Sequence, residues 1–283
     1  MSAPTPETLP PLRDTIKAHG LDARKALGQH FLLDLNLTRR IVRAAGELEG
    51  HLVIEVGPGP GGLTRALLES AAAHVIAIER DARCIAALME LQAAWPGRLT
   101  IIEGDALEAN WAALAQGRPT HVIANLPYNV GTPLLIGWLK QAALFQGLAL
   151  MFQKEVGDRL LAPVGGKAYG RLAVMTQWIC KASRAFDIPA RAFTPPPKVD
   201  SSVILLVPRA APLAPANWDA MEKVVAAAFG QRRKMLRASL RQLPVDSDAL
   251  LADTGIDGSL RAEQLEIAGF AALARAFEEL PRR

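Results

Sequence analysis

Residues 52–62 read LVIEVGPGPGG, an apolar run that passes directly into four glycines and two prolines. The run is typical of a buried strand, and the glycines let the chain turn sharply and bring its backbone close to a ligand where a helix starts. The string fits both GxGxxG and GxGxG spacing. It is therefore compatible with a dinucleotide site, an S-adenosylmethionine site or a strand–helix turn that binds no ligand.

Similar Val- and Ile-rich runs recur along the chain at intervals of about 21 to 27 residues. They are VIAIE at 75–79, LTIIEGD at 99–105, HVIANLPY at 121–128 and LALMF at 148–152. Each interval leaves room for one helix, and Ala- and Leu-rich segments at 63–68, 81–94 and 133–139 supply it. The pattern predicts repeated βαβ units, and so an α/β, Rossmann-like, doubly wound parallel sheet.

The order changes after residue 151. We expect helices from Lys154 and over Arg171–Cys180, a Gly-rich loop at 163–170, and strands near 184–188 and 199–207 that end the sheet as a hairpin. The sequence PRAAPLAPANW at 208–218 has neither helical nor strand periodicity. The predicted division is an N-terminal extension at 1–22, a Rossmann-like domain at 23–208, a linker at 209–218 and a small all-helical domain at 219–283.

Two acids stand where predicted strands end. Glu79 closes the second strand, where a carboxylate can accept hydrogen bonds from both hydroxyls of a ribose, and Asp105 follows the third, where it can accept from the amine of an adenine. Ligands of open α/β sheets bind outside the carboxyl ends of the strands, so both acids point to an adenosine-bearing cofactor. Glu79 could otherwise be a solvated strand-end acid.

The fourth strand ends in Asn125, Leu126, Pro127 and Tyr128. Adenine N6 is a poor nucleophile because its lone pair is delocalised into the ring. The Asn125 side-chain oxygen and the Leu126 carbonyl, held by Pro127, could accept its two amino protons, while Tyr128 offers a face on which a flipped-out base can stack. The alternative for this tetrapeptide is a bend with a buried tyrosine.

Composition excludes several classes of protein. The chain has 283 residues, 32 Lys and Arg against 28 Asp and Glu, and half of its residues are apolar, which excludes a disordered chain. Early prolines argue against a signal peptide, and no uncharged stretch suits a membrane span. Two cysteines 96 residues apart, Cys84 and Cys180, indicate neither a zinc site nor a disulfide framework. We expect a cytoplasmic protein without a metal.

The chain resembles the small-subunit rRNA adenine dimethyltransferase family, the KsgA type, over nearly its whole length. The matching stretches are LGQHFLLD at 27–34, IEVGPGPGGLT at 54–64, AIERD at 77–81, EGDAL at 103–107, NLPYNV at 125–130, QKEVGDRL at 153–160, YGRLAV at 169–174, FTPPPKVDS at 193–201 and FGQRRKMLR at 229–237. The resemblance implies transfer of methyl groups from S-adenosylmethionine to N6 of two adjacent adenosines in the 3′-terminal hairpin loop of small-subunit (16S) rRNA, during assembly of the 30S subunit.

The resemblance also implies roles for individual residues. His30 and Leu32 would cap the methionine end of the cofactor, Gly57 would lie against it, Glu79 would hold the ribose, Asp105 the adenine, and Asn125 would mark the transfer point. Phe193 would face the target base opposite Tyr128, although it could instead lie in the core at the start of the last strand. The family commonly has Asn at the position of His30, so a backbone contact there would survive while a side-chain contact could differ.

A cationic stretch in the C-terminal unit suggests where RNA binds. Residues 231–243 carry five basic side chains and no acid: Arg232, Arg233, Lys234, Arg237 and Arg241. Arg233, Arg237 and Arg241 recur at helical spacing, which predicts a stripe on one helical face with Met235, Leu236 and Leu240 beneath it. A solvated helix face is the alternative. The expected partner is the immature small subunit, bound by a monomer.

Three other functions compete with this hypothesis. Resistance methyltransferases modify large-subunit rRNA by the same chemistry, but FTPPPKVDS and FGQRRKMLR favour the small-subunit branch. A non-catalytic RNA-binding factor on the same fold would leave the intact Asn125–Tyr128 segment unexplained. A nicotinamide dehydrogenase would explain the glycines and Glu79, but gives no role to Asp105 or Asn125.

Overall fold

The computed structural model describes residues 5–21, 30–127 and 129–283. Contacts between α-carbons divide the chain into two compact units. The first comprises Met1–Gly157 and Ser183–Val207, and the second comprises Asp158–Ala182 and Pro208–Arg283. No helix among the described residues is long and apolar enough to cross a membrane.

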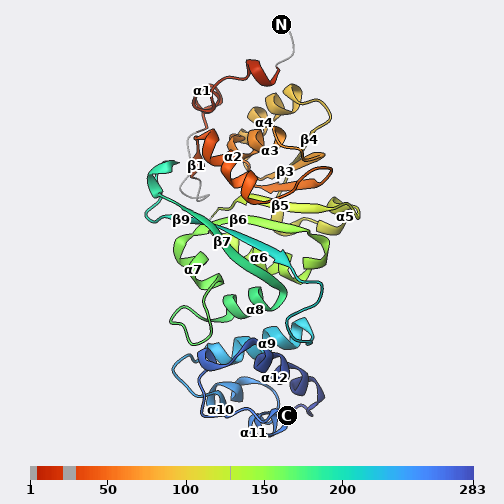
Figure 1. The fold of residues 1–283 in the computed structure, drawn as a ribbon, viewed down its shortest axis with the longest axis vertical. Helices are drawn as coiled ribbons and strands as arrows, with labels where there is room; N and C mark the ends of the chain where they lie inside the picture. Colours follow the sequence, from red (N-terminus) through yellow and green to blue (C-terminus); the bar gives the residue numbers. More distant parts are fainter. Residues whose placement is uncertain (1–4, 22–29, 128) are drawn as a thin grey trace. The chain divides into compact units, whose positions relative to one another are not determined.

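A seven-stranded sheet forms the centre of the first unit (Figure 1), in the order β4-β3-β2-β5-β6-β9-β7. Its strands are β2 (Leu52–Val56), β3 (His74–Glu79), β4 (Leu99–Glu103), β5 (Thr120–Asn125), β6 (Gly147–Gln153), β7 (Cys180–Ile188) and β9 (Ser201–Pro208). The five strands from β4 to β6 are parallel, and β9 is antiparallel to β6. The predicted Rossmann-like sheet with a hairpin-like end is thus confirmed.

Helices and short elements connect these strands. In the first unit they are η1 (Pro6–Thr8), α1 (Leu12–Ala18), β1 (Phe31–Leu32), α2 (Leu35–Ala44), α3 (Gly62–Leu68), α4 (Ala82–Ala94), η3 (Ala106–Glu108), α5 (Trp111–Ala115), α6 (Gly131–Lys140), η4 (Ala142–Leu144), α7 (Lys154–Leu160, which runs on into the second unit), η5 (Ala190–Ala192) and β8 (Phe193–Thr194). Every residue of β2 is buried, as expected for a central strand covered on both faces.

The core of this unit follows the two-residue period of the strands. Val53, Val75 and Ile123 lie in one apolar cluster with Ile41 of α2, Leu67 of α3 and Leu91 of α4. Helices α2, α3 and α4 therefore cover the same face of the sheet. This packing fixes the helices that begin just beyond the carboxyl ends of β2 and β3, where the glycine turn and Glu79 lie.

The second unit is helical (Figure 1, lower helices). It contains α8 (Arg171–Ile179), α9 (Trp218–Gly230), α10 (Leu236–Ser239), η6 (Leu240–Gln242), α11 (Ser247–Thr254), η7 (Ala262–Gln264) and α12 (Ile267–Glu279). Its core joins Trp178 of α8 to residues of α9, α11 and α12. Stacked rings of Phe229 and Phe270, 5.6 Å apart between centroids, tie α9 to α12.

The division between residues 207 and 208 lies within one residue of the predicted domain end, but residues 158–182 belong to a different unit than predicted. Asp158–Ala182 groups with the C-terminal helices because α8 buries Trp178 against them, and the hydroxyl of Tyr169 donates to the Leu265 carbonyl at 3.3 Å. The expected linker at 209–218 is also anchored. The indole nitrogen of Trp178 donates to the Ala214 carbonyl at 2.7 Å, and the Leu213 backbone nitrogen donates to the Trp178 carbonyl at 2.8 Å.

Candidate functional site

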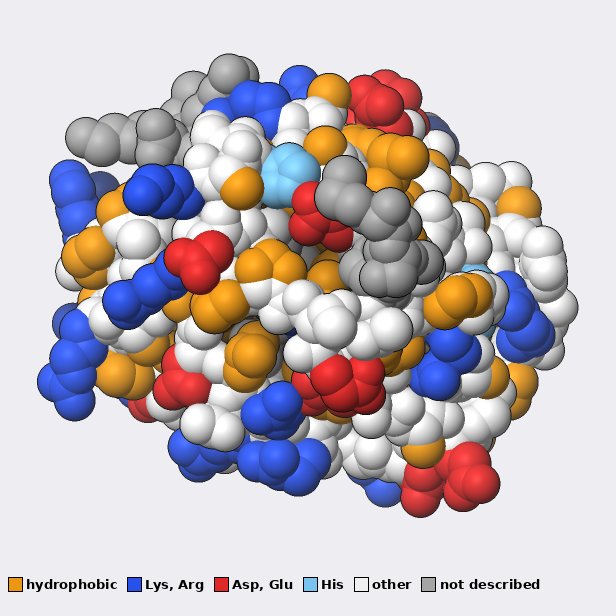
Figure 2. All heavy atoms as spheres, turned by 90° about the horizontal axis from the view of Figure 1, so that it is seen from above, with side chains coloured by type: hydrophobic (Ala, Val, Ile, Leu, Met, Phe, Trp, Pro, Cys, Tyr) orange, Lys and Arg blue, Asp and Glu red, His pale blue; other side chains and the backbone are white. Residues whose placement is uncertain are grey.

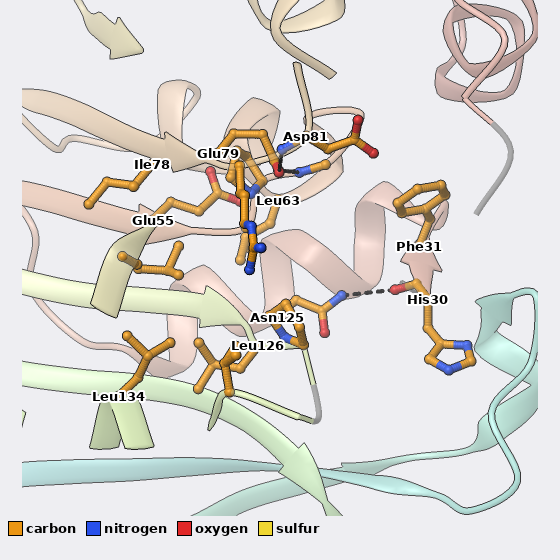
Figure 3. A pocket seen from close by; sticks show the side chains of 18 of the residues that line it. His30, Phe31, Glu55, Leu63, Ile78, Glu79, Asp81, Asn125, Leu126 and Leu134 are labelled. Atoms are coloured by element: carbon orange, nitrogen blue, oxygen red, sulfur yellow. Dashed lines mark hydrogen bonds between the residues drawn. The ribbon is translucent and has the colours of Figure 1, made fainter. Parts of the chain in front are cut away.

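A cavity opens beyond the carboxyl ends of β2, β3, β4 and β5 (Figure 3). All six residues predicted for the cofactor line it: His30, Leu32, Gly57, Glu79, Asp105 and Asn125. They come from five separate stretches of chain that only the folded sheet brings together. The cavity also contains the predicted Leu126 and Pro127, whereas Tyr128 lies outside the described residues.

The turn after β2 needs its glycines. Gly57, Gly59 and Gly61 all have left-handed backbone angles, with φ of 68°, 55° and 87°. A β-carbon at residue 61 would stand 2.5 Å from a methyl carbon of Leu91, and one at residue 59 would stand 3.1 Å from the ring of Phe31. The turn thus brings bare backbone to the wall of the cavity, as a site for an extended cofactor requires.

Glu79 is buried, not a solvated strand-end acid. Its side chain is 6 % exposed, and its two oxygens accept from the Gly59 and Asp81 backbone nitrogens at 2.8 and 2.7 Å. Burial raises the pKa of Glu79, and the backbone hydrogen bonds oppose that shift. A carboxylate has about four acceptor positions, more than its backbone donors occupy, so it can still accept from a hydroxyl in the cavity. This arrangement suits a ribose.

Asp105 caps the short helix η3 at the same end of the sheet. One carboxylate oxygen accepts from the Leu107 backbone nitrogen at 3.0 Å, and the other lies 3.4 Å from a guanidinium nitrogen of the exposed Arg80. The side chain is about one-third exposed, so it is open to a donor in the cavity. Asp105 is thereby placed to accept from an exocyclic amine.

Glu55 is a functional candidate that sequence reasoning missed. It lies within the quoted glycine segment, is 1 % exposed, lines the cavity and accepts a hydrogen bond from the Thr64 hydroxyl at 2.7 Å. Burial raises the pKa of Glu55 to about 8, and the charge of Glu79 adds to the shift. The available signal was an acid between Ile54 and Val56, in an otherwise apolar strand.

Asn125 ends β5 with its side chain at the cavity (Figure 3). Its amide nitrogen donates to the His30 backbone carbonyl at 3.1 Å, so the amide oxygen is the end left to accept from a substrate. Leu126 is buried, and the Pro127 ring would lie 3.4 Å from a β-carbon at residue 57. The segment that ends β5 and the glycine turn therefore pack against each other.

His30 holds a second contact through its ring. Its Nδ1 atom lies 2.8 Å from the Pro195 carbonyl oxygen, and since a carbonyl only accepts, Nδ1 carries the proton. The backbone of His30 therefore contacts Asn125, and its ring contacts the proline-rich segment after Phe193. The predicted contacts of His30 with the methionine end of the cofactor stay a prediction.

The structure buries Phe193 in the core, which is the alternative that the sequence left open, and its role opposite the target base stays a prediction. The side chain is 3 % exposed and belongs to the cluster that includes Ile41 and Ile188. Its backbone pairs with Leu32 in the small sheet of β1 and β8. Phe193 does not line the cavity, so its position serves the strand pair that carries Leu32.

The basic stretch of the second unit is not one helix, contrary to the predicted stripe. Residues 231–234 form a turn, α10 covers only Leu236–Ser239, and Arg241 lies in η6. Leu236 and Leu240 are buried as expected, whereas Met235 is 40 % exposed. The five cations, called the basic cluster below, are all exposed: Arg232, Arg233, Lys234, Arg237 and Arg241.

Contacts within the second unit position the basic cluster. The Arg232 guanidinium donates to the Lys167 carbonyl, and the Arg237 backbone nitrogen donates to the Gly258 carbonyl at 3.0 Å. On the face drawn in Figure 2, by contrast, acidic side chains stand between the basic ones. A run of cations unmixed with acids is the better candidate for contacts with a polyanion.

Comparisons with known proteins agree with this geometry. A family model described as ribosomal RNA adenine dimethylase matches residues 20–279. The ribosomal RNA small subunit methyltransferase A of Rhodospirillum rubrum is 61 % identical to this chain, in an alignment that covers 98 % of this chain and 96 % of the relative. The protein of the same name from Azorhizobium caulinodans is also 61 % identical, and the alignment covers 96 % of this chain and 94 % of the relative.

Two solved structures share the fold. A dimethyladenosine transferase from Plasmodium falciparum is 28 % identical with a TM-score of 0.77, over 88 % of this chain and 98 % of that chain. The 23S rRNA methyltransferase ErmE is 26 % identical with a TM-score of 0.64, over 88 % and 99 %.

Proposed function

The chain belongs to the ribosomal RNA adenine dimethylase family, and we propose that it dimethylates N6 of two adjacent adenosines in the 3′-terminal hairpin loop of small-subunit (16S) rRNA. It is an S-adenosylmethionine-dependent rRNA adenine dimethyltransferase. The 61 % identity to small-subunit methyltransferases, against 26 % to the 23S enzyme ErmE, supports the choice of subunit. The substrate is the immature 30S subunit, and the enzyme acts as a cytoplasmic monomer.

The residues at the cavity fit S-adenosylmethionine. The buried Glu79 carboxylate can still accept from a ribose hydroxyl, and Asp105 can accept from the adenine amine. Gly57 presents backbone without a side chain, while His30 and Leu32 line the end of the cavity assigned to the methionine moiety. When bound, the cofactor supplies an electrophilic methyl group, so that the N6–carbon bond forms as the sulfonium–carbon bond breaks.

One observation carries the proposed chemistry: the amide nitrogen of Asn125 is held by the His30 carbonyl, which leaves the amide oxygen as an acceptor at the cavity. The Asn125 oxygen and the Leu126 carbonyl accept the two amino protons of the flipped adenine. These hydrogen bonds draw the N6 lone pair out of conjugation with the ring and toward the methyl group. The methylated nitrogen is cationic and acidic, so it loses its proton to water without a strong base.

The basic cluster supplies the contacts with RNA. Its cations lie on a turn and two short helical segments, so they can reach phosphates at several angles rather than along one helix. Contacts with phosphates orient the RNA and supply affinity, while the residues that line the cavity recognise the target adenosine.

The test is to locate the methyl groups. The full-length protein would be incubated with labelled S-adenosylmethionine and immature small subunits from a strain that lacks the modification, beside large subunits and free rRNA. Dimethylated adenosine pairs confined to the small-subunit 3′ hairpin are expected. Label on the large subunit would contradict the substrate, and tight binding to small subunits without label would indicate an assembly factor. The Asn125→Ala variant serves as the catalytic control.

A further inference from the structure

The N-terminal helix α1 is fastened to the helix that follows the glycine turn. Arg65 of α3 is 6 % exposed, and its guanidinium donates to the Pro10 carbonyl at 2.7 Å and to the Thr15 hydroxyl at 3.1 Å. Both acceptors lie at α1, which precedes the residues matched by the family model. Burial lowers the pKa of Arg65, whereas the charges of Glu90 and Glu69 raise it.

Helix α1 also covers the first residue of α3. A β-carbon at residue 62 would lie 2.6 Å from the Leu32 carbonyl oxygen and 2.9 Å from a methyl carbon of Leu12. Leu32 and Gly62 both line the cofactor cavity. The start of α3 therefore packs closely against both β1 and α1.

A second set of contacts joins the same segment to α4. The His19 Nε2 atom lies 2.8 Å from a carboxylate oxygen of Glu90, and Leu21, which is 1 % exposed, packs with Cys84 and Ala87. Helix α4 begins immediately after Glu79 and Asp81, which form the ribose wall of the cavity. Residues 10–21 thus contact both helices whose first turns shape the cavity.

We propose that residues 10–21 act as an intramolecular clamp, with Arg65 as its positioning residue, which holds the glycine turn and Glu79 in the geometry that binds S-adenosylmethionine. Glu79 precedes α4, and its carboxylate accepts a hydrogen bond from the backbone nitrogen of Gly59, which precedes α3. The proposed ribose site therefore keeps its geometry only while the starts of α3 and α4 stay at the same distance from each other. A clamp that keeps this conformation populated raises the apparent affinity in proportion to the competent fraction. The inference rests on the proposed function only for the identity of the ligand.

Arg65 is suited to this role because its hydrogen-bond partners are supplied from outside its own helix. A buried guanidinium needs acceptors, so the closed arrangement of α1 and α3 is stable only while Pro10 and Thr15 keep their positions beside Arg65. The coupling runs in both directions: a cofactor bound against Gly62 and Glu79 favours the closed position of α1.

The test measures cofactor binding by isothermal titration calorimetry with the full-length protein and S-adenosylmethionine, without RNA. Arg65→Met removes both hydrogen bonds while retaining side-chain length, and Thr15→Val removes one acceptor with little change of shape. Arg98→Met is the matched control. Arg98 also donates to carbonyls of the helix α3 region, at Leu68 and Ala72, but at the end of α3 that points away from Gly62.

We expect the dissociation constant to rise about tenfold in Arg65→Met and about threefold in Thr15→Val, with Arg98→Met within about twofold of the wild type. Amide hydrogen exchange at residues 57–64 should quicken in the first two variants only. Unchanged affinity in Arg65→Met, or an equal loss in Arg98→Met, would overturn the clamp. If Arg65→Met does not fold, Thr15→Val decides by the same criterion. The binding measurement contains no rRNA, so a wrong rRNA substrate would leave it unaffected.

Discussion

The side-chain amide nitrogen of Asn125 lies 3.1 Å from the backbone carbonyl oxygen of His30, across 95 residues of sequence. Because a carbonyl accepts and never donates, this contact fixes which end of the amide faces the cavity. The acceptor required for the adenine amine is thus oriented by main chain, which no substitution at residue 30 can remove directly. His30 influences the reaction through the position of its backbone.

Loss of the Asn125 side chain should affect turnover rather than cofactor binding. In Asn125→Ala we expect kcat to fall by about two orders of magnitude, equivalent to about 2.7 kcal/mol of transition-state stabilisation, since one of two acceptors for the amino group is gone. The S-adenosylmethionine dissociation constant, measured by calorimetry, should stay within about twofold. Parallel loss of both quantities would contradict the assigned role.

The contribution of the hydrogen bond made by the His30 ring can be tested by replacing His30 with a residue whose side chain can make the same bond. In Asn the amide nitrogen stands two bonds from Cβ, as Nδ1 does in His, so His30→Asn can still donate to the Pro195 carbonyl. We expect this variant to retain kcat within about threefold and His30→Ala to lose about tenfold, the cost of about one hydrogen bond. Steady-state kinetics with small subunits would measure both. Activity equal to that of the wild type in His30→Ala would show that the ring contact is dispensable.

Glu79→Gln should weaken cofactor binding. The carboxylate receives a backbone N–H at each oxygen, and an amide would direct its own NH2 group at one of those donors. We expect the S-adenosylmethionine dissociation constant to rise at least tenfold, about 1.4 kcal/mol. Glu69→Gln, which alters an acid paired with Arg39 on the surface, provides the control and should bind normally. An unchanged S-adenosylmethionine dissociation constant in Glu79→Gln would show that Glu79 does not bind the ribose.

Glu55 should make stability fall as pH rises. Its pKa in the folded protein is about 8 against 4.5 for the free side chain, so the folded state binds the proton more tightly between these values. The contribution is fully present below about pH 4.5 and is lost as pH rises through about 8, with a size on the order of a few kcal/mol. His121, whose pKa burial lowers to about 4, acts in the opposite sense as pH falls below 6.5.

The Glu55 contribution is obtained as a difference. Glu55→Gln keeps an acceptor for the Thr64 hydroxyl but does not titrate. The Tm of the variant minus the Tm of the wild type should therefore increase as pH is raised from 5 to 8.5. The His121 effect is common to both proteins and cancels. A constant gap between the two midpoints over this range would show that Glu55 has an ordinary pKa.

The basic cluster should give RNA binding a measurable salt dependence. In the double variant Arg233→Gln, Lys234→Gln, we expect weaker binding to small-subunit rRNA and a plot of log affinity against log salt that is shallower by up to about 0.7 to 0.9 per lost phosphate contact. Arg283→Gln removes a cation already paired with Asp246 and serves as the control. An unchanged slope in the double variant would place the RNA elsewhere.

Local patterns in the sequence were sufficient to predict the sheet and most of the residues that line the cavity. The β2 and β3 runs are largely apolar. Gly57, Glu79 and Asp105 stand at or just after the carboxyl ends of strands in a parallel sheet, so their convergence could be predicted without knowledge of side-chain packing. The pairing of β9 between β6 and β7 could not be derived to the same degree, because strand order at a sheet edge depends on long-range contacts.

The break of the helix in the basic stretch and the burial of Phe193 have the same physical cause, which is packing between segments far apart in the sequence. The stripe of Arg233 and Arg237 assumed that 3.6-residue spacing implies a continuous helix, but the chain turns at residues 231–234 and only the apolar Leu236 and Leu240 enter the core. Phe193 was placed opposite the base by the family resemblance, whereas its burial depends on packing with β1, from another part of the chain. Arg65 gave no signal, because its partners lie fifty residues or more away.

The path of the chain between its two compact units constrains how such enzymes can be recombined. The chain passes from one unit to the other at residues 157, 182 and 207, so the helical unit is encoded by two separate stretches of the gene. A chimera joined at residue 208 would take Trp218 and Leu265 from one parent and leave their partners, Trp178 and Tyr169, with the other. Exchange of the helical unit between relatives therefore requires a double crossover that carries residues 158–182 along with the C-terminal part.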